Sequence, residues 1–216
     1  AVYLSVRRSY GFKKALLFTG LFFVPFTLIV DHVGVLDGSW LVPETIFPFR
    51  LLGTVPLEDF VISFTTMMFV VLFYQQFLDR ERRRLFYPRL HTLVVILLAS
   101  LALFFTVFLV SPSSLNIPYA YLYIGFLGIV PTACFLYRHP NFFKKFAILG
   151  LYFFLVLLFF ELVGIELGWW IFPGTNFLGW VHILQYKFPL EEFILWIGLF
   201  PVGIVTYYEF FDDDEK

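Results

Sequence analysis

The sequence predicts an all-α integral membrane protein of about six transmembrane helices, in two pseudo-symmetric repeats joined in part by interfacial or re-entrant segments. Two observations support this fold class. Hydrophobic residues make up 60% of the 216 residues and charged residues only 14%, so the chain is far more apolar than an average soluble domain. In addition, two long segments align with each other, which indicates an internal repeat. The length fits a single membrane domain over 1–216.

The repeat is clearest after the first and fifth apolar runs. Residues 31–43 align without a gap on residues 161–173, a shift of 130 positions that keeps a tryptophan and two glycines in place. From Pro56 onwards the shift is 133, so the second copy has three extra loop residues. We expect repeat one at about 13–80, repeat two at about 144–211, and a linking loop with two further spans at 81–143.

Apolar runs of membrane-spanning length place the six predicted helices. They are expected at about 15–30, 57–77, 90–110, 119–137, 146–163 and 190–210. The connections 32–55 and 164–188 are too apolar and aromatic for solvated loops, so they are interpreted as interfacial or re-entrant segments. The matching glycines at the start of each connection indicate a shared turn, and they are Gly34, Gly38, Gly164 and Gly168.

Lysine and arginine are concentrated on one side of the predicted membrane domain. The flank before the first span, the loop 80–89 and the turn 138–145 together carry twelve of them, whereas the opposite side has only Arg50 and Lys187. Because this bias sets topology, both termini are predicted to be cytoplasmic, in a multi-pass protein of the cytoplasmic membrane. The second and sixth helices then begin at the non-cytoplasmic face.

Two adjacent acids open both of those helices. The motifs are Pro56-Leu57-Glu58-Asp59 and Pro189-Leu190-Glu191-Glu192. A charge at membrane depth is costly unless it is paired or neutralised, and desolvation can shift a buried carboxyl pKa by up to about 3–5 units towards the neutral acid. Acids that point inward would therefore be able to donate protons. The alternative is that they face water and complement the helix dipole, for about 0.3–1 kcal/mol. The candidate catalytic residues are Glu58, Asp59, Glu191 and Glu192.

Further candidates lie at matching positions near these acids. Asp31 and Glu161 end the first and fifth predicted spans and are expected to line the same cavity as hydrogen-bond partners or proton relays. Trp40 and Trp170 match across the repeat and would provide aromatic walls that stabilise a cation, worth up to about 2 kcal/mol per desolvated contact. The plainer alternatives are acids that reach interfacial water and tryptophans of the interfacial aromatic belt.

Several classes of site lack support in the sequence. Cys134 is the only cysteine, which excludes an intrachain disulfide and a cysteine-based metal site. His32 and His182 do not match across the repeat, so no metal site is predicted. No Gly-x-Gly-x-x-Gly fingerprint, phosphate loop or repeated Asp-x-x-x-Asp pattern is present, which disfavours Rossmann-type cofactor binding and prenyl transfer. The basic loop is interpreted as topogenic, so no nucleic-acid partner is expected.

On these residues the chain resembles the integral-membrane lycopene cyclase domain family, which occurs as two small subunits in some bacteria and as one fused chain in archaea, fungi and other bacteria. The resemblance rests on a Pro-x-Glu-Glu/Asp element in each half, preceded by a tryptophan-containing connection. It implies a lycopene β-cyclase that converts lycopene through γ-carotene to β-carotene with no cofactor and no net redox change. It also implies that the acids of the two motifs protonate a terminal double bond and remove a different proton after ring closure.

Other interpretations stay open at this point. One alternative is a related carotenoid enzyme whose product carries an ε ring or a hydrated end group instead of a β ring. In another class, the duplicated acids serve a small proton-coupled or cation-coupled transporter, although such folds commonly use broken helices. A structural membrane protein is the third interpretation. The expected partners are lycopene or a related carotenoid and the lipid bilayer, and association with further copies or with other carotenoid enzymes is left open.

Overall fold

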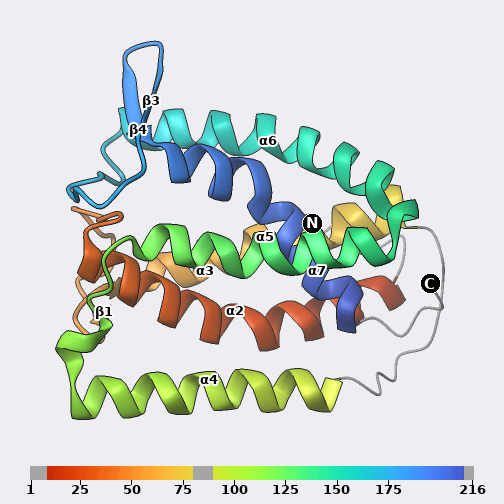
Figure 1. Cartoon of the computed structure of the whole chain (residues 1–216), viewed down its shortest axis with the longest axis horizontal. Coiled ribbons are helices and arrows are strands. Elements are labelled where there is room, and N and C mark those ends of the chain that lie inside the picture. The colour runs from red at the N-terminus through yellow and green to blue at the C-terminus, as the bar shows by residue number, and fades with distance from the viewer. Residues whose placement is uncertain (1–8, 80–89, 212–216) are drawn as a thin grey trace.

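The computed structural model describes residues 9–79 and 90–211 as a bundle of long helices with two short hairpins at one end (Figure 1). The α-helices are α2 (Ser9–Asp37), α3 (Leu57–Phe73), α4 (Leu90–Val110), α5 (Ala120–Arg138), α6 (Phe143–Glu166) and α7 (Phe200–Phe211). Shorter helices are the π-helices η1 (Tyr74–Leu78) and η4 (Glu192–Leu199) and the 3-10 helices η2 (Pro112–Leu115) and η3 (Pro140–Phe142). The strands are β1 (Arg50–Leu51), β2 (Val55–Pro56), β3 (Trp180–Ile183) and β4 (Tyr186–Pro189).

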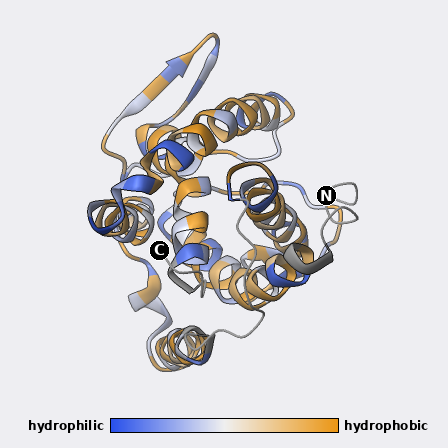
Figure 2. Ribbon diagram, turned by 90° about the vertical axis from the view of Figure 1, so that its right-hand side faces the viewer, coloured by the Kyte–Doolittle hydropathy of each residue, from blue (hydrophilic) through white to orange (hydrophobic). Residues whose placement is uncertain are grey.

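The described helices have the length and composition of a membrane protein. Four of them are long and apolar enough to cross a bilayer, at Phe12–Asp37, Leu57–Leu78, Ala120–Arg138 and Pro140–Glu166. Hydrophobic residues predominate along these helices (Figure 2), and several of their large apolar side chains are exposed, such as Val61, Leu127 and Leu155. This confirms the helical membrane class. Helices also occupy the two other predicted places, as α4 and as η4 followed by α7.

The predicted orientation depends largely on charges that lie outside the described residues. These are the basic flank at 1–8 and the basic loop at 80–89, with the acidic tail at 212–216 beyond the last helix. Placement of both termini in the cytoplasm therefore stays a prediction.

The centre of the bundle is formed by α7, which packs against α3, α5 and α6. Its residues Val202, Ile204 and Val205 are buried in one cluster with side chains of α2, α3 and α6. In contrast, α4 lies to one side and packs mainly against α2 (Figures 1 and 2). The bundle is thus closely packed around α7 and looser beside α4.

The last helix begins as a π-helix, η4, and becomes α-helical at Phe200. Pro201 follows directly, and its missing N–H cannot close the regular hydrogen bond to the preceding turn. A π-helical segment is rare and often occurs at functional sites. Here it starts at Glu192, one of the predicted acids.

Both long connections contain an antiparallel hairpin, which the sequence did not predict. In β1–β2, Arg50 pairs with Pro56, six positions on, whereas in β3–β4 Trp180 pairs with Pro189, nine positions on. The three extra residues of the second copy therefore lie inside its hairpin. The turns hold Leu52 and Leu184 at φ angles of 53° and 54°, a conformation that leucine rarely adopts. No turn motif in the sequence marked these positions.

The ends of α2 and α6 have the same backbone geometry. Gly38 and Gly168 have φ angles of 73° and 67°, which glycine adopts without steric cost. The N–H of the next residue donates to the carbonyl oxygen of Gly34 in one case and of Gly164 in the other, at 2.8 and 2.9 Å. The turn predicted from the matching glycines is present at both places.

A tryptophan packs on a glycine at both helix ends. The indole of Trp40 lies so close to Gly34, and that of Trp170 so close to Gly164, that a Cβ at either glycine would overlap the ring. One residue further on, Leu41 and Ile171 exchange two backbone hydrogen bonds of 2.8 Å each. These two residues match each other at the shift of 130 positions.

Replacing either of these glycines with alanine tests the packing of the tryptophans. Alanine is normally favoured over glycine inside a helix by up to about 1 kcal/mol. We expect Gly34→Ala and Gly164→Ala to destabilise the protein instead, because the added methyl group displaces the indole. Gly20→Ala is the matched control, since a Cβ at Gly20 in α2 meets nothing within 4 Å. Thermal unfolding and tryptophan fluorescence in detergent provide the measurement, and equal behaviour of all three variants would contradict the packing.

Candidate functional site

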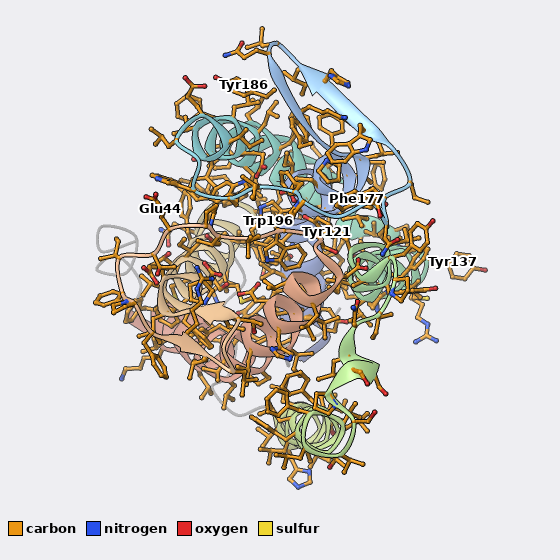
Figure 3. All side chains as sticks on the ribbon, turned by 90° about the vertical axis from the view of Figure 1, so that its left-hand side faces the viewer. Glu44, Tyr121, Tyr137, Phe177, Tyr186 and Trp196 are labelled. Atoms are coloured by element: carbon orange, nitrogen blue, oxygen red, sulfur yellow. The ribbon has the colours of Figure 1, made fainter. Side chains whose placement is uncertain are left out.

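A cavity of about 470 Å³ lies inside the bundle. Its wall is mostly apolar and aromatic, and its aromatic members include Phe22, Phe26, Trp40, Tyr121, Phe160, Trp170, Trp196 and Phe200. Seen from the hairpin end, Tyr121 and Trp196 lie in the interior of the bundle, whereas Tyr137 projects outward from α5 (Figure 3). A cavity of this size and composition is typical of a site for an apolar small molecule.

Four carboxyl groups line this apolar cavity, and they come from matching positions of the chain. They are Asp31, Asp59, Glu161 and Glu192. Trp40 and Trp170, the other predicted substrate-binding residues, also line it. The structure thus brings six of the eight predicted site residues to one cavity and leaves Glu58 and Glu191 outside its wall.

The four acids form two pairs. Asp31 at the end of α2 lies close enough to Asp59 at the start of α3 for their carboxyls to interact electrostatically. Glu161 in α6 and Glu192 at the start of η4 also lie close enough for their carboxyls to interact. Two negative charges side by side in an apolar cavity disfavour each other, so these surroundings favour a neutral carboxylic acid on one member of the pair.

Two other residues donate hydrogen bonds to the Glu161–Glu192 pair. The indole N–H of Trp170 donates to Oε1 of Glu161 at 2.8 Å, and the hydroxyl of Tyr121 donates to Oε2 of Glu192. Glu161 and Glu192 are only 1% and 5% exposed. Since the Trp170 ring also lies against a glycine of α6, its N–H is held in a fixed direction. Two hydrogen bonds, one from Trp170 and one from Tyr121, thus position this pair.

The Asp31–Asp59 pair has less support. Trp40 occupies the place that corresponds to Trp170, but it packs edge-on against Tyr121 with ring centroids 5.0 Å apart. Within the described part of the chain, Oδ2 of Asp31 is buried with no hydrogen-bond partner. Tyr121 thus contacts both halves of the site, through Trp40 on one side and Glu192 on the other. The two acid pairs are therefore alike in position and different in environment.

Tyr121 was not among the site residues that the sequence predicts. It lies in the segment 81–143, outside both predicted repeats, and no spacing relates it to the acids. Its position gives the one indication of a role: Tyr121 is the second residue of α5, at the same end of the bundle as both acid motifs. A tyrosine-rich stretch of this kind is as typical of the membrane interface, which is why the pattern alone did not identify it.

The first acid of each motif holds the connection that precedes it. Oε1 of Glu58 accepts the backbone N–H of Phe47 at 2.9 Å, and Oε1 of Glu191 accepts that of Leu178 at 2.6 Å. Each bond holds one of the long connections against the start of the helix that follows it. In each motif, the first acid therefore faces the connection and the second acid faces the cavity.

Asp37 fastens the same end of the bundle. Its Oδ2 accepts the hydroxyl of Ser39 at 3.0 Å and the N–H of Ala120 at 3.1 Å, while its Oδ1 accepts the side-chain N–H of Asn176 at 2.7 Å. These bonds join the end of α2, the start of α5 and the second connection. Asp37 thereby holds α5, and with it Tyr121, above the cavity.

The histidines do not join the acids. Nδ1 of His32 is hydrogen-bonded to the hydroxyl oxygen of Thr54 at 2.6 Å, and its ring packs against Phe104 and Phe108. Over residues 9–79 and 90–211, no group of three or more histidine, cysteine or acidic residues is arranged to hold a metal ion.

Comparison with known proteins gives no independent guide to function. The chain matches no model of a protein family, and neither the curated proteins nor the solved structures contain a significant match. The functional proposal therefore depends on the geometry of the cavity and its acids.

Replacement of Glu191 tests its role in holding the connection. Glu191→Gln keeps an oxygen that can accept the N–H of Leu178, whereas Glu191→Leu does not. We expect Glu191→Leu to cost about 0.5–1.5 kcal/mol of unfolding free energy, the usual net contribution of one hydrogen bond, and Glu191→Gln to cost less. Denaturant unfolding in detergent measures the difference. Equal stability of the two variants would show that the bond to Leu178 contributes little.

Proposed function

We propose that the chain is an integral-membrane carotenoid end-group cyclase that converts lycopene to β-carotene by way of γ-carotene, without a cofactor. The observation that carries this proposal is the meeting of four carboxyls from matching positions in one apolar, aromatic cavity. A hydrocarbon offers no charged group, so its binding must come from shape and apolar burial. Protonation of an alkene needs a carboxylic acid shielded from water.

The proposal includes six membrane spans in two pseudo-symmetric repeats. Three structural facts support this organisation. Leu41 and Ile171, which match each other, are hydrogen-bonded to each other, as expected for residues beside a two-fold axis. Gly38 and Gly168 share a left-handed turn. The two acid pairs come from corresponding helix ends, with one member from the end of a helix and the other from the start of the next.

The reaction begins with proton transfer to the terminal double bond. Glu192 is the proposed acid, because it lies in the cavity wall beside Glu161, where apolar surroundings and a neighbouring carboxyl favour the neutral acid. Addition of the proton leaves a tertiary carbocation. Trp196, Phe200 and Trp170 present aromatic rings to the same cavity, and such rings stabilise a cation by up to about 2 kcal/mol per contact when water is absent.

Ring closure and proton loss complete the reaction. The π electrons of the neighbouring alkene form the new carbon–carbon bond and move the cation into the ring. A carboxylate of the Asp31–Asp59 pair, the proposed base, then removes a proton from the adjacent ring carbon and leaves the ring double bond. One proton enters and a different one leaves, so the product is an isomer of the substrate and no oxidant or reductant is needed.

Substitution of the second acid in each motif tests the assignment. We expect Glu192→Gln and Asp59→Asn to lower lycopene conversion by about 10²–10⁴-fold, the usual contribution of an acid–base residue. Glu191→Gln and Glu58→Gln are matched controls in the same motifs and should keep most of the activity, because their side chains hold the connections. Chromatography of pigments formed by the purified chain in membranes, with and without added flavin and reductant, provides the measurement. Equal loss in both sets of variants would refute the division of roles.

Isotope incorporation tests the chemistry independently of mutagenesis. The protonating carboxyl exchanges its hydrogen with the medium, whereas the proton that is removed comes from the substrate. In deuterated buffer, each ring formed should therefore carry one deuterium at a carbon that was part of the terminal double bond. Mass spectrometry and NMR of the product detect the label. A ring without the label would exclude an exchangeable carboxylic acid as the donor.

A further inference from the structure

We infer that the cavity admits its polyene sideways from the membrane, through an opening between α4 and α5 that stays occupied by the tail of the bound substrate. This α4–α5 portal is formed by Ile96 and Ser100 of α4 and by Leu127 and Gly128 of α5, which all line the cavity. The inference rests on the proposed function, because it describes how the same cavity takes a long hydrocarbon.

The first observation is the exposure of the portal residues. Ile96 is 51% exposed and Leu127 is 61% exposed, although both contribute to the cavity wall. A side chain that lines a cavity and is also accessible from outside marks the place where the cavity opens. At the other end, Glu161 and Glu192 are almost completely buried, with 1% and 5% of their surface exposed. Substrate therefore meets the portal first and the carboxyls last.

The second observation is the arrangement of the two helices. α4 and α5 are joined through η2, and near that turn Phe104 and Ile124 pack in one apolar cluster. Further along, α4 stays with α2, while α5 packs against α7 (Figures 1 and 2). The outer faces of both helices carry exposed apolar side chains, such as Leu98 and Val130. The portal consequently faces hydrocarbon.

The third observation is the length of the cavity relative to that of the substrate. On α2 the wall extends from Phe22 to Asp31, which corresponds to about 14 Å at 1.5 Å per residue. A carotenoid backbone of about thirty bonds spans roughly 35 Å, at about 1.2 Å per bond of an extended chain. On η4 and α7 the wall extends further, from Glu192 to Tyr207, but this is at most about 22 Å at the same rise, so the whole molecule does not fit inside. With one end at the acids, the remainder must pass out through the portal.

Gly128 offers a way to block the portal without disturbing the protein. A Cβ at this position meets nothing within 4 Å, although the glycine lies in the cavity wall. Leucine at 128 would therefore occupy the space that the substrate tail needs. Gly20 of α2 is the matched control, since its Cβ also meets nothing within 4 Å and it lies outside the cavity wall.

The experiment compares two substrates in Gly128→Leu, Gly20→Leu and the unaltered chain, all in lipid bilayers. One substrate is lycopene, and the other is an acyclic polyene with the same end group and about eleven backbone bonds, roughly 13 Å long, which fits inside the cavity. Quenching of tryptophan fluorescence reports binding, because Trp40, Trp170 and Trp196 line the cavity. Chromatography of the products reports conversion.

We expect Gly128→Leu to weaken lycopene binding at least about tenfold, while the short polyene binds within about twofold of the unaltered chain and Gly20→Leu changes neither. Equal lycopene affinity of the two variants would overturn the portal, and so would equal loss for the long and the short polyene. Binding of neither polyene by the unaltered chain would overturn it as well. Binding with this selectivity but without conversion would support the portal and refute the cyclase proposal.

Discussion

The burial of carboxyl groups in apolar surroundings is the constraint on which this site depends. An isolated carboxylate in such a place is costly, so each acid must share a proton, accept hydrogen bonds or both. Glu161 and Glu192 satisfy this requirement through the donors Trp170 and Tyr121. The elements that supply these groups are α6, η4, α5 and the second connection. The end of the bundle is therefore built around that one network.

The two acid pairs show how matching positions acquire different properties. Both pairs join the end of one helix to the start of the next, and a tryptophan packs on a glycine beside each. Only the second pair, however, receives hydrogen bonds from its tryptophan and from Tyr121. An acid and a base need different proton affinities, and the unequal hydrogen bonding provides a physical route to that difference. The asymmetry comes in part from α5, which supplies Tyr121, and in part from Trp170.

Much of this arrangement could be predicted from the sequence. Hydrophobic runs predicted where the helices lie, and the matching glycines predicted the turn at Gly38 and Gly168. The division of roles between adjacent acids could not be predicted in this way, because consecutive residues of a helix can both line one cavity, as Ile62 and Ser63 do. In the structure Asp59 lines the cavity, whereas Glu58 holds the connection.

Other features could not be predicted because they depend on contacts between distant segments. Tyr121 reaches Glu192 only because Asp37 and the second connection hold the start of α5 over the cavity. The π-helical winding of η4 and the left-handed leucines of the hairpins also lack a local sequence signal. In these places tertiary packing decides the conformation, whereas the long helices follow the pattern of the residues themselves.

The backbone bridge between Leu41 and Ile171 makes this contact tolerant of substitution. Its hydrogen bonds join main-chain groups, so they do not depend on which side chains are present at these two positions. In the sequence, Leu41 lies between Asp31 and Asp59, and Ile171 lies between Glu161 and Glu192. The same contact therefore joins two segments that carry different acids.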